Sequence, residues 1–204
     1  MLFERDELDK VRRFYSTRLD ADATPLLRLS GLARALGLDE LLLKDESSRF
    51  GLPAFKILGT QYAVARLIRM GEVTDLACAT AGNHGRAVAR AARLANLRGH
   101  VYVPRGTVRA RLSAIRAEGA DLVEVDADYD ECVRIMAAEA ARHGWTIVSD
   151  TAWPGNEEIP RWIMAGYTWM LDEAARTWGP TPPDLLVVQA GVGSLAGAVA
   201  GWLE

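Results

Sequence analysis

Short apolar runs alternate with longer stretches of helical character through the middle of the chain. Four runs have the length and composition of buried strands: residues 76–80, 100–104, 121–125 and 145–149. The stretches between them have helical patterns: residues 85–95, 108–119 and 129–144. Because strands that alternate with helices in this way build βαβ units, the pattern predicts an α/β fold with a parallel sheet and right-handed crossovers.

One strand and one helix are predicted before this region. Residues 41–45 have the pattern of a short strand, and residues 59–70 have that of a helix. We expect a loop between these two elements, and this loop carries Lys56.

The region after residue 150 predicts a long helix and then a strand. The helix is expected over residues 159–178, with Pro160 in its first turn, where a missing backbone N–H is tolerated. Residues 184–189 form an apolar run of the buried-strand type. The glycine-rich stretch that follows predicts a turn into another helix.

Composition and charge exclude several classes of protein. Of the 204 residues, 50% are hydrophobic and 25% are charged, which is typical of a globular protein. The formal net charge of -3 offers no basic surplus for neutralising phosphates, so we expect no nucleic-acid partner. No apolar run reaches the length of a membrane span, and the charged N-terminal stretch is unlike a secretory signal.

The cysteines and histidines give no sign of a metal or disulfide framework. Cys78 and Cys132 lie far apart without CxxC spacing, so we expect neither a structural disulfide nor a zinc site. The histidines at 84, 100 and 143 show no ligand spacing, so we expect no metal. These features predict a cytoplasmic protein.

Lys56 stands in an otherwise apolar, glycine-containing run, between Phe55 and Ile57. Most such lysines lay their stems on the surface and keep the ammonium group in water. The alternative is a desolvated amine that acts as a neutral nucleophile and forms a Schiff base with an aldehyde cofactor.

A glycine-rich turn follows the predicted strand at 184–189 and opens the last helix. Backbone N–H groups in such a turn, together with the helix N-terminus, favour a phosphate. The residues concerned are Gly191, Val192, Gly193, Ser194 and Leu195. A dinucleotide site is an alternative, but it requires an acidic residue about 20 positions later, and the chain ends at Glu204. A third interpretation is a turn that only allows close packing.

A second strand-to-helix turn, Ala-Thr-Ala-Gly-Asn-His-Gly, occupies residues 79–85. Asn83 and His84 stand at the predicted helix entry, where backbone and side-chain donors converge on a ligand. Alternatively, Thr80 or Asn83 caps the helix.

Four stretches occur in the order found in the fold-type II pyridoxal-phosphate enzymes: residues 44–64, 79–88, 149–174 and 189–201. Among these enzymes they resemble the diaminopropionate ammonia-lyases most, with threonine dehydratases as more distant relatives. The resemblance implies a tryptophan-synthase-β-like α/β architecture. In it, residues 61–150 form a small βαβ domain, and residues 1–60 with 151–204 form part of a large cofactor-binding domain.

The resemblance also implies roles for particular residues. Lys56 would hold the aldehyde of pyridoxal 5'-phosphate and later remove the substrate α-proton. Asn83 would bond the ring hydroxyl, and the turn at Gly191–Leu195 would cradle the phosphate. Asp150 would face the substrate's second amino group and assist proton transfer. The substrate carboxylate would bind at backbone groups of Thr80, Gly82 and His84.

Two departures from the family pattern change what we expect. Ala81 stands where the ammonia-lyases carry aspartate, the proposed base for the D-enantiomer, so we expect activity confined to the L-isomer. The chain also stops soon after the phosphate turn, whereas family members continue. We therefore expect weak cofactor binding by the chain alone, with self-association as a homodimer or a complementing chain covering the gap.

The sequence thus predicts a carbon–nitrogen lyase that eliminates ammonia from 2,3-diaminopropionate and yields pyruvate. Two alternatives remain open. One is a dehydratase or lyase acting on serine, threonine or another β-substituted amino acid. The other is a non-catalytic remnant that binds a partner chain or ligand without chemistry.

Overall fold

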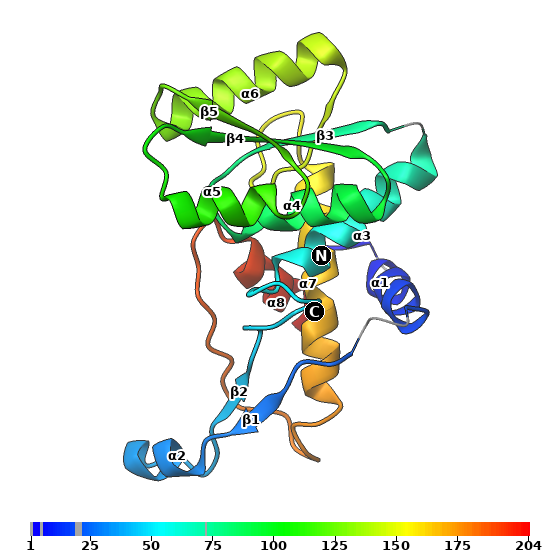
Figure 1. Cartoon of the computed structure of the whole chain (residues 1–204). Coiled ribbons are helices and arrows are strands. Elements are labelled where there is room, and N and C mark those ends of the chain that lie inside the picture. Colours follow the sequence, from blue (N-terminus) through cyan, green and yellow to red (C-terminus); the bar gives the residue numbers. More distant parts are fainter. Residues whose placement is uncertain (1, 5, 19–21, 72) are drawn as a thin grey trace.

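A four-stranded parallel sheet with helices on both faces forms the upper part of the molecule in Figure 1. The computed structural model describes residues 2–4, 6–18, 22–71 and 73–204. The strand order is β5 (Asp121–Val125), β4 (Arg98–Pro104), β3 (Asp75–Ala79) and β6 (Thr146–Ile147). This arrangement confirms the predicted α/β fold with a parallel sheet, although the strand expected over 145–149 is reduced to two residues.

Three helices cover this sheet. Helices α4 (Asn83–Leu94) and α5 (Arg109–Arg116) lie on one face, and α6 (Tyr129–His143) lies on the other (Figure 1). Alternate side chains of a strand point to opposite faces. Accordingly, Ala77 packs in the cluster beneath α6, whereas the neighbouring Cys78 belongs to the core on the α4 side.

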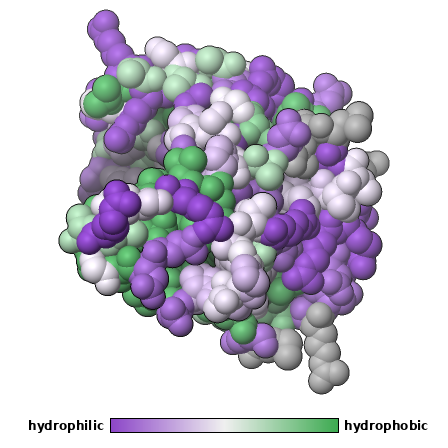
Figure 2. All heavy atoms as spheres, turned by 90° about the horizontal axis from the view of Figure 1, so that it is seen from below, coloured by the Kyte–Doolittle hydropathy of each residue, from purple (hydrophilic) through white to green (hydrophobic). Residues whose placement is uncertain are grey.

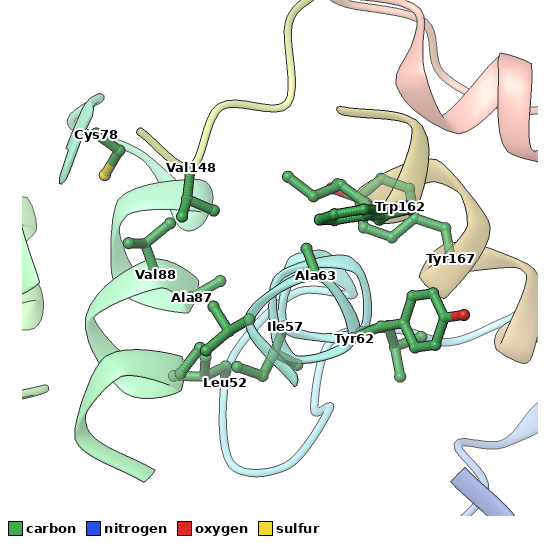
Figure 3. Packing of buried hydrophobic residues seen from close by; sticks show 14 of the residues in the cluster. Leu52, Ile57, Tyr62, Ala63, Cys78, Ala87, Val88, Val148, Trp162 and Tyr167 are labelled. Carbon is green, nitrogen blue, oxygen red and sulfur yellow. The ribbon is translucent and has the colours of Figure 1, made fainter. Parts of the chain in front are cut away.

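Two further helices, α3 (Lys56–Met70) and α7 (Glu158–Ala175), cross next to α4. Figure 3 shows α3 between the Ala87 and Val88 side chains of α4 and the aromatic side chains of α7. The expected helix at 59–70 therefore begins earlier than predicted, and Lys56 is its first residue instead of lying in a loop. The first turn of α7 contains Pro160, as predicted.

Glycines allow α3 and α7 to approach each other at their crossing. A Cβ atom on Gly166 would lie 2.7 Å from the Leu58 carbonyl oxygen and 2.8 Å from the Gly59 Cα. A Cβ on Gly59 would lie 2.5 Å from the Ile163 carbonyl oxygen. Because the atoms in the way are backbone, neither position can accept a side chain unless the helices separate.

Replacing Gly166 by alanine is therefore expected to lower the free energy of unfolding by about 1–3 kcal/mol, the usual cost of overpacking. The measurement is urea unfolding followed by circular dichroism. Gly31→Ala is the matched control, because a Cβ there meets no atom within 4 Å. This helical substitution should stabilise by about 0.5–1 kcal/mol. Equal effects of the two substitutions would contradict the close helix contact.

The remaining elements surround this core. Helix α1 (Glu7–Ser16) packs on α7, and α8 (Ser194–Leu203) also contacts α7. Strand β2 (Leu42–Lys44) is the strand predicted at 41–45, and it pairs antiparallel with β1 (Leu26–Arg28) instead of joining the parallel sheet. Helix α2 (Ser30–Leu36) connects these two strands.

Strands β1 and β2 and helix α2 expose large apolar side chains. These elements lie at the bottom of the view in Figure 1. Figure 2 shows the molecule from below, and hydrophobic surface lies there among polar areas. The exposed side chains of this part of the chain are Leu27, Leu32, Leu36, Leu38 and Leu43.

The predicted buried strand at 184–189 is wrong. The segment forms no strand, and the side chains of Leu185 and Val187 are 75% and 86% exposed. An apolar run becomes a strand only where a neighbouring strand bonds to it, and no described strand pairs with this segment.

The predicted division of the chain into a small and a large domain, at residues 60 and 150, remains a prediction. Helix α3 continues through residue 60 without a break.

Among the described residues, no helix combines the length and apolar character needed to cross a membrane.

Candidate active site

A cavity of about 660 Å³ opens beside the carboxyl end of β3. Ligands of open parallel sheets usually bind at this edge, where the loops after the strands meet. Side chains from α3, α4 and α6, from the loop after β6, and from the glycine turn before α8 contribute to its wall. The lining residues are Lys56, Cys78, Ala79, Thr80, Asn83, His84, Tyr129, Asp130, Val133, Arg134, Met136, Ser149, Asp150, Thr151, Trp153 and Val192.

Lys56 lies at the cavity wall and is mostly shielded from solvent. Its side chain is 21% exposed, and its Nζ donates a hydrogen bond of 2.7 Å to Asp150 Oδ2. The same nitrogen lies 5.3 Å from the centroid of the Phe55 ring and 5.4 Å from that of Tyr167. The amine therefore faces the cavity between a carboxylate and two aromatic rings, instead of extending into bulk water.

Asp150 and His84 complete a polar group at this wall. His84 Nε2 lies 2.9 Å from the Val148 carbonyl oxygen. Because a carbonyl only accepts, Nε2 carries the proton and Nδ1 carries a lone pair. That Nδ1 is buried without a hydrogen-bond partner in the described part of the chain, 3.9 Å from Asp150 Oδ2.

The charges of these groups follow from burial and from each other. Burial lowers the pKa of His84, which keeps the ring neutral, and Asp150 offsets only part of this effect. Burial alone would raise the pKa of Asp150, but the charge and the hydrogen bond of Lys56 hold it below its usual value. The site thus presents a carboxylate and a neutral imidazole acceptor beside the amine.

The turn at residues 79–85 presents unpaired donors to the cavity. Helix α4 begins at Asn83, and its N-cap residue, Gly82, provides no side-chain cap. Thr80 Oγ1 instead accepts the Gly82 N–H at 3.2 Å. Neither Thr80 nor Asn83 therefore caps the helix, and the backbone N–H groups of its first turn have no intrahelical acceptor.

Gly82 and Ala81 are not among the residues that line the larger cavity. Together with Asn83 they line a second cavity of about 330 Å³, between α4 and α5. Of the described residues that line this second cavity, two are arginines, Arg86 and Arg111, and none carries a carboxylate.

The glycine turn before α8 reaches the same larger cavity through Val192. Gly193 has a φ angle of 90°, in the left-handed region that glycine adopts without strain. A Cβ at Gly191 or Gly193 would meet no atom within 4 Å, so there is open space at the N-terminus of α8. Ser194 begins the helix and is buried, and Leu195 belongs to the core.

Six of the predicted site residues thus line one cavity: Lys56, Thr80, Asn83, His84, Asp150 and Val192. The other residues of the glycine turn adjoin it. Sequence reasoning missed the contributions of Tyr129 and Trp153. A usable signal existed, because Tyr129 begins the helix after β5 and Trp153 follows β6, and loops after parallel strands gather at one sheet edge.

Comparisons with known proteins agree with this geometry. A family model described as pyridoxal-phosphate dependent enzyme matches residues 18–204. The chain is 40% identical to a diaminopropionate ammonia-lyase of Escherichia coli strain K12, over 99% of this chain and 56% of that relative. A crystal structure of the Escherichia coli enzyme with an aminoacrylate–PLP azomethine reaction intermediate matches with a TM-score of 0.92 at 40% identity, over 99% of this chain and 56% of that one.

A more distant relative is named for a different reaction. Mouse L-serine dehydratase/L-threonine deaminase is 29% identical over 89% of this chain and 53% of that relative. The chain spans about half the length of the curated relatives it matches.

Proposed function

The chain belongs to the family of pyridoxal-phosphate-dependent enzymes, and from this premise we propose that it takes part in eliminating ammonia from 2,3-diaminopropionate. The overall reaction converts 2,3-diaminopropionate and water to pyruvate and two molecules of ammonia. The observation that supports the proposal most directly is the Lys56 amine, which shares one cavity with the Asp150 carboxylate and with both glycine-containing turns.

The residues around this cavity fit pyridoxal 5'-phosphate. Lys56 offers an amine for the aldehyde, and Asn83 stands at the wall with an amide for the ring hydroxyl. The open space at Gly193 and the N-terminus of α8 suit a phosphate, because backbone N–H groups and the helix dipole favour an anion there. The unpaired Nδ1 of His84 is a further polar atom that a bound molecule could satisfy.

Bound pyridoxal phosphate supplies an electron sink for the pair of electrons left when the substrate α-proton is removed. The chain's own residues supply position and proton transfer. Lys56 Nζ would hold the aldehyde carbon, and as a free amine the same nitrogen would accept the α-proton. Unpaired N–H groups in the first turn of α4 would bind the substrate carboxylate.

Asp150 and His84 would recognise the second amino group of the substrate. The Asp150 carboxylate and the His84 Nδ1 lone pair lie 3.9 Å apart. Both are acceptors, so an ammonium group satisfies them and the hydroxyl of serine offers only one donor. This pair therefore supports a diamino acid as substrate over serine or threonine.

We further propose that the protein acts on the L-isomer and works in the cytoplasm as a homodimer or with a complementing chain. The absence of a carboxylate among the described residues around Ala81 supports the preference for the L-isomer. The exposed leucines of β1, α2 and β2 support an assembly, because large apolar patches commonly mark contact surfaces.

Ammonia release from a panel of amino acids tests the proposed substrate. We expect L-2,3-diaminopropionate to be turned over faster than its D-isomer, L-serine or L-threonine. Asp150→Asn should lower the rate with diaminopropionate by about 10²–10⁴-fold, the usual contribution of a group that transfers protons. Asp9→Asn, on exposed α1, is the matched control and should leave the rate unchanged.

A faster rate with L-serine or L-threonine would favour the dehydratase reaction instead, as the more distant mouse relative suggests. Turnover of D-diaminopropionate would contradict the role assigned to Ala81.

A further inference from the structure

The second cavity, of about 330 Å³, lies between the neighbouring helices α4 and α5 (Figure 1). Of the residues that the structure describes, only Asn83 lines both this cavity and the larger one, so the second cavity is a different space from the one around Lys56. Small residues leave this space open. Four of its seven lining residues are alanine or glycine: Ala81, Gly82, Ala110 and Ala114.

The charged side chains at the wall of this second cavity are both cations. Arg86 comes from α4 and Arg111 comes from α5. Arg111 is exposed and forms no ion pair with a carboxylate of the described residues. Two cations at one cavity, with no carboxylate among the described lining residues, create a positive potential there. Such a potential favours the binding of an anion.

Arg86 keeps hydrogen-bond donors without acceptors. Its Nε is buried and has no partner in the described part of the chain, and its Nη2 reaches Glu118 Oε1 only at 3.4 Å. Glu118 also accepts hydrogen bonds from Arg90 and Arg93, so three arginines share its single charge. The Arg86 side chain is 23% exposed and lines the cavity, so a ligand there can reach its guanidinium group. An anion would supply the acceptors that Glu118 does not.

The two arginines and the size of the cavity indicate the kind of anion. The planar guanidinium group offers parallel N–H donors that match the oxygens of a carboxylate or a phosphate. Cavities that hold small molecules have volumes of about 300–1,000 Å³, and this one lies near the lower limit. It therefore suits a molecule of a few carbon atoms better than a nucleotide. One arginine from each helix matches a ligand with two negative charges.

We propose that the cavity between α4 and α5 binds a small organic dianion, a dicarboxylate or a phosphate ester of a few carbon atoms, through Arg86 and Arg111. The inference goes beyond the proposed function, because it requires neither the cofactor nor the chemistry of Lys56. A bound dianion would connect α4 to α5, since each helix supplies one of the arginines. Its binding to the folded chain should also raise the melting temperature.

Isothermal titration calorimetry of the chain at constant ionic strength tests this inference. The probes are succinate, glycerol 3-phosphate and succinamide, which resembles succinate in size but carries no charge. We expect at least one of the two dianions to bind with a dissociation constant of about 1 mM or lower, and succinamide not to bind. The dianion that binds more tightly identifies the anionic group that the site prefers.

Arg111→Gln removes one of the two cations from an exposed helix surface. A hydrogen bond between charged groups accounts for about 10- to 100-fold in affinity, so this variant should bind the preferred dianion more weakly by that factor. Arg109→Gln is the matched control. It removes the same charge from an exposed position of the same helix, but Arg109 does not line the cavity. Its affinity for the dianion should equal that of the wild-type chain.

Arg86→Gln tests the other side of the cavity. We expect a similar loss of affinity, and a smaller increase in melting temperature when the dianion is added. The variant should remain folded, which circular dichroism checks, because Glu118 keeps its hydrogen bonds from Arg90 and Arg93. Lys56→Ala should bind the dianion as the wild-type chain does, since Lys56 lines only the larger cavity.

The inference is overturned if neither dianion binds to the wild-type chain, or if succinamide binds as tightly as succinate. Equal affinities of the Arg111→Gln and Arg109→Gln variants would also overturn it. Loss of binding in Lys56→Ala, with full binding in Arg111→Gln, would place the anion in the larger cavity instead. These outcomes are independent of the proposed function, because none of them involves ammonia release.

Discussion

Replacing Lys56 by alanine is expected to reduce ammonia release from 2,3-diaminopropionate by about 10³-fold or more. The substitution removes the amine that would hold the cofactor aldehyde and accept the α-proton, and proton transfer alone commonly contributes about 10²–10⁴-fold. It should also abolish the visible absorbance of the lysine-bound cofactor. The measurements are ammonia release at saturating substrate and an absorbance spectrum of the chain with pyridoxal phosphate.

Lys10→Ala is the matched control for this prediction. Lys10 pairs with Asp6, the N-cap residue of α1, at 2.9 Å, and it does not line the cavity. Its replacement should change neither the rate nor the spectrum. If Lys56→Ala retained the rate of the wild-type chain, the amine at the cavity wall would have no part in the chemistry.

Replacing Arg49 by methionine is expected to lower the free energy of unfolding by about 3–5 kcal/mol, because it removes the buried cation that pairs with two carboxylates, Glu46 and Glu173. Arg49 is 0% exposed. Its guanidinium group donates to both Glu173 carboxylate oxygens, at 2.7 and 2.6 Å, and to Glu46. Lys44 reaches Glu173 as well, at 2.7 Å, so this cluster joins β2 and the loop before α3 to α7.

Urea unfolding followed by circular dichroism measures this loss. Arg105→Met is the matched control, since Arg105 pairs with Asp126 on the surface and its removal should change stability little. A loss for Arg49→Met no larger than for this control would show that the buried cluster does not stabilise the fold.

The stability that Arg49 contributes through Glu173 is expected to fall as the pH is lowered. Burial alone would raise the pKa of Glu173, but Arg49 and Lys44 hold it below its ordinary value. A carboxyl group with a lowered pKa contributes stability above its unfolded value, and this contribution is lost as the pH falls through the folded value. The difference between wild type and Arg49→Met should therefore be full at neutral pH and shrink below about pH 4.

The sequence predicted the central βαβ region well because its signals are local. Each strand there lies in a short apolar run that ends at or just before a polar residue or a proline, and each helix has its own periodic pattern. The sheet then follows from the rule that such units pair in parallel. The segment at 184–189 has the same local pattern, but it forms no strand because pairing depends on a neighbour elsewhere in the fold.

The start of α3 could not be read from local propensity. The predicted helix started at Gly59, because the stretch before it was interpreted as a loop that carries Lys56. In the structure this glycine lies inside the helix because the Ile163 carbonyl oxygen and the Tyr167 ring occupy the space of a side chain. The reason for the glycine is a tertiary contact, so the position of Lys56 on a helix required the packing partner to be known.

In the candidate site, too, some features could be predicted from local sequence and others depend on tertiary contacts. Its motif residues were predicted because glycine turns after strands, and the lysine, carry recognisable chemistry. The neutral tautomer of His84 depends on the Val148 carbonyl, and the Lys56 amine bonds a carboxylate, Asp150, that lies 94 positions away in the sequence. Neither is encoded by a local pattern, because each arises where segments distant in the sequence meet.

Reductive trapping tests the central claim most directly. The chain has three lysines, Lys10, Lys44 and Lys56, so borohydride reduction with pyridoxal phosphate followed by peptide mass mapping can assign the modified amine without ambiguity. The account predicts the phosphopyridoxyl mass on the Lys56 peptide. It is contradicted if the mass is found on Lys10, Lys44 or the N-terminus while Lys56 remains unmodified.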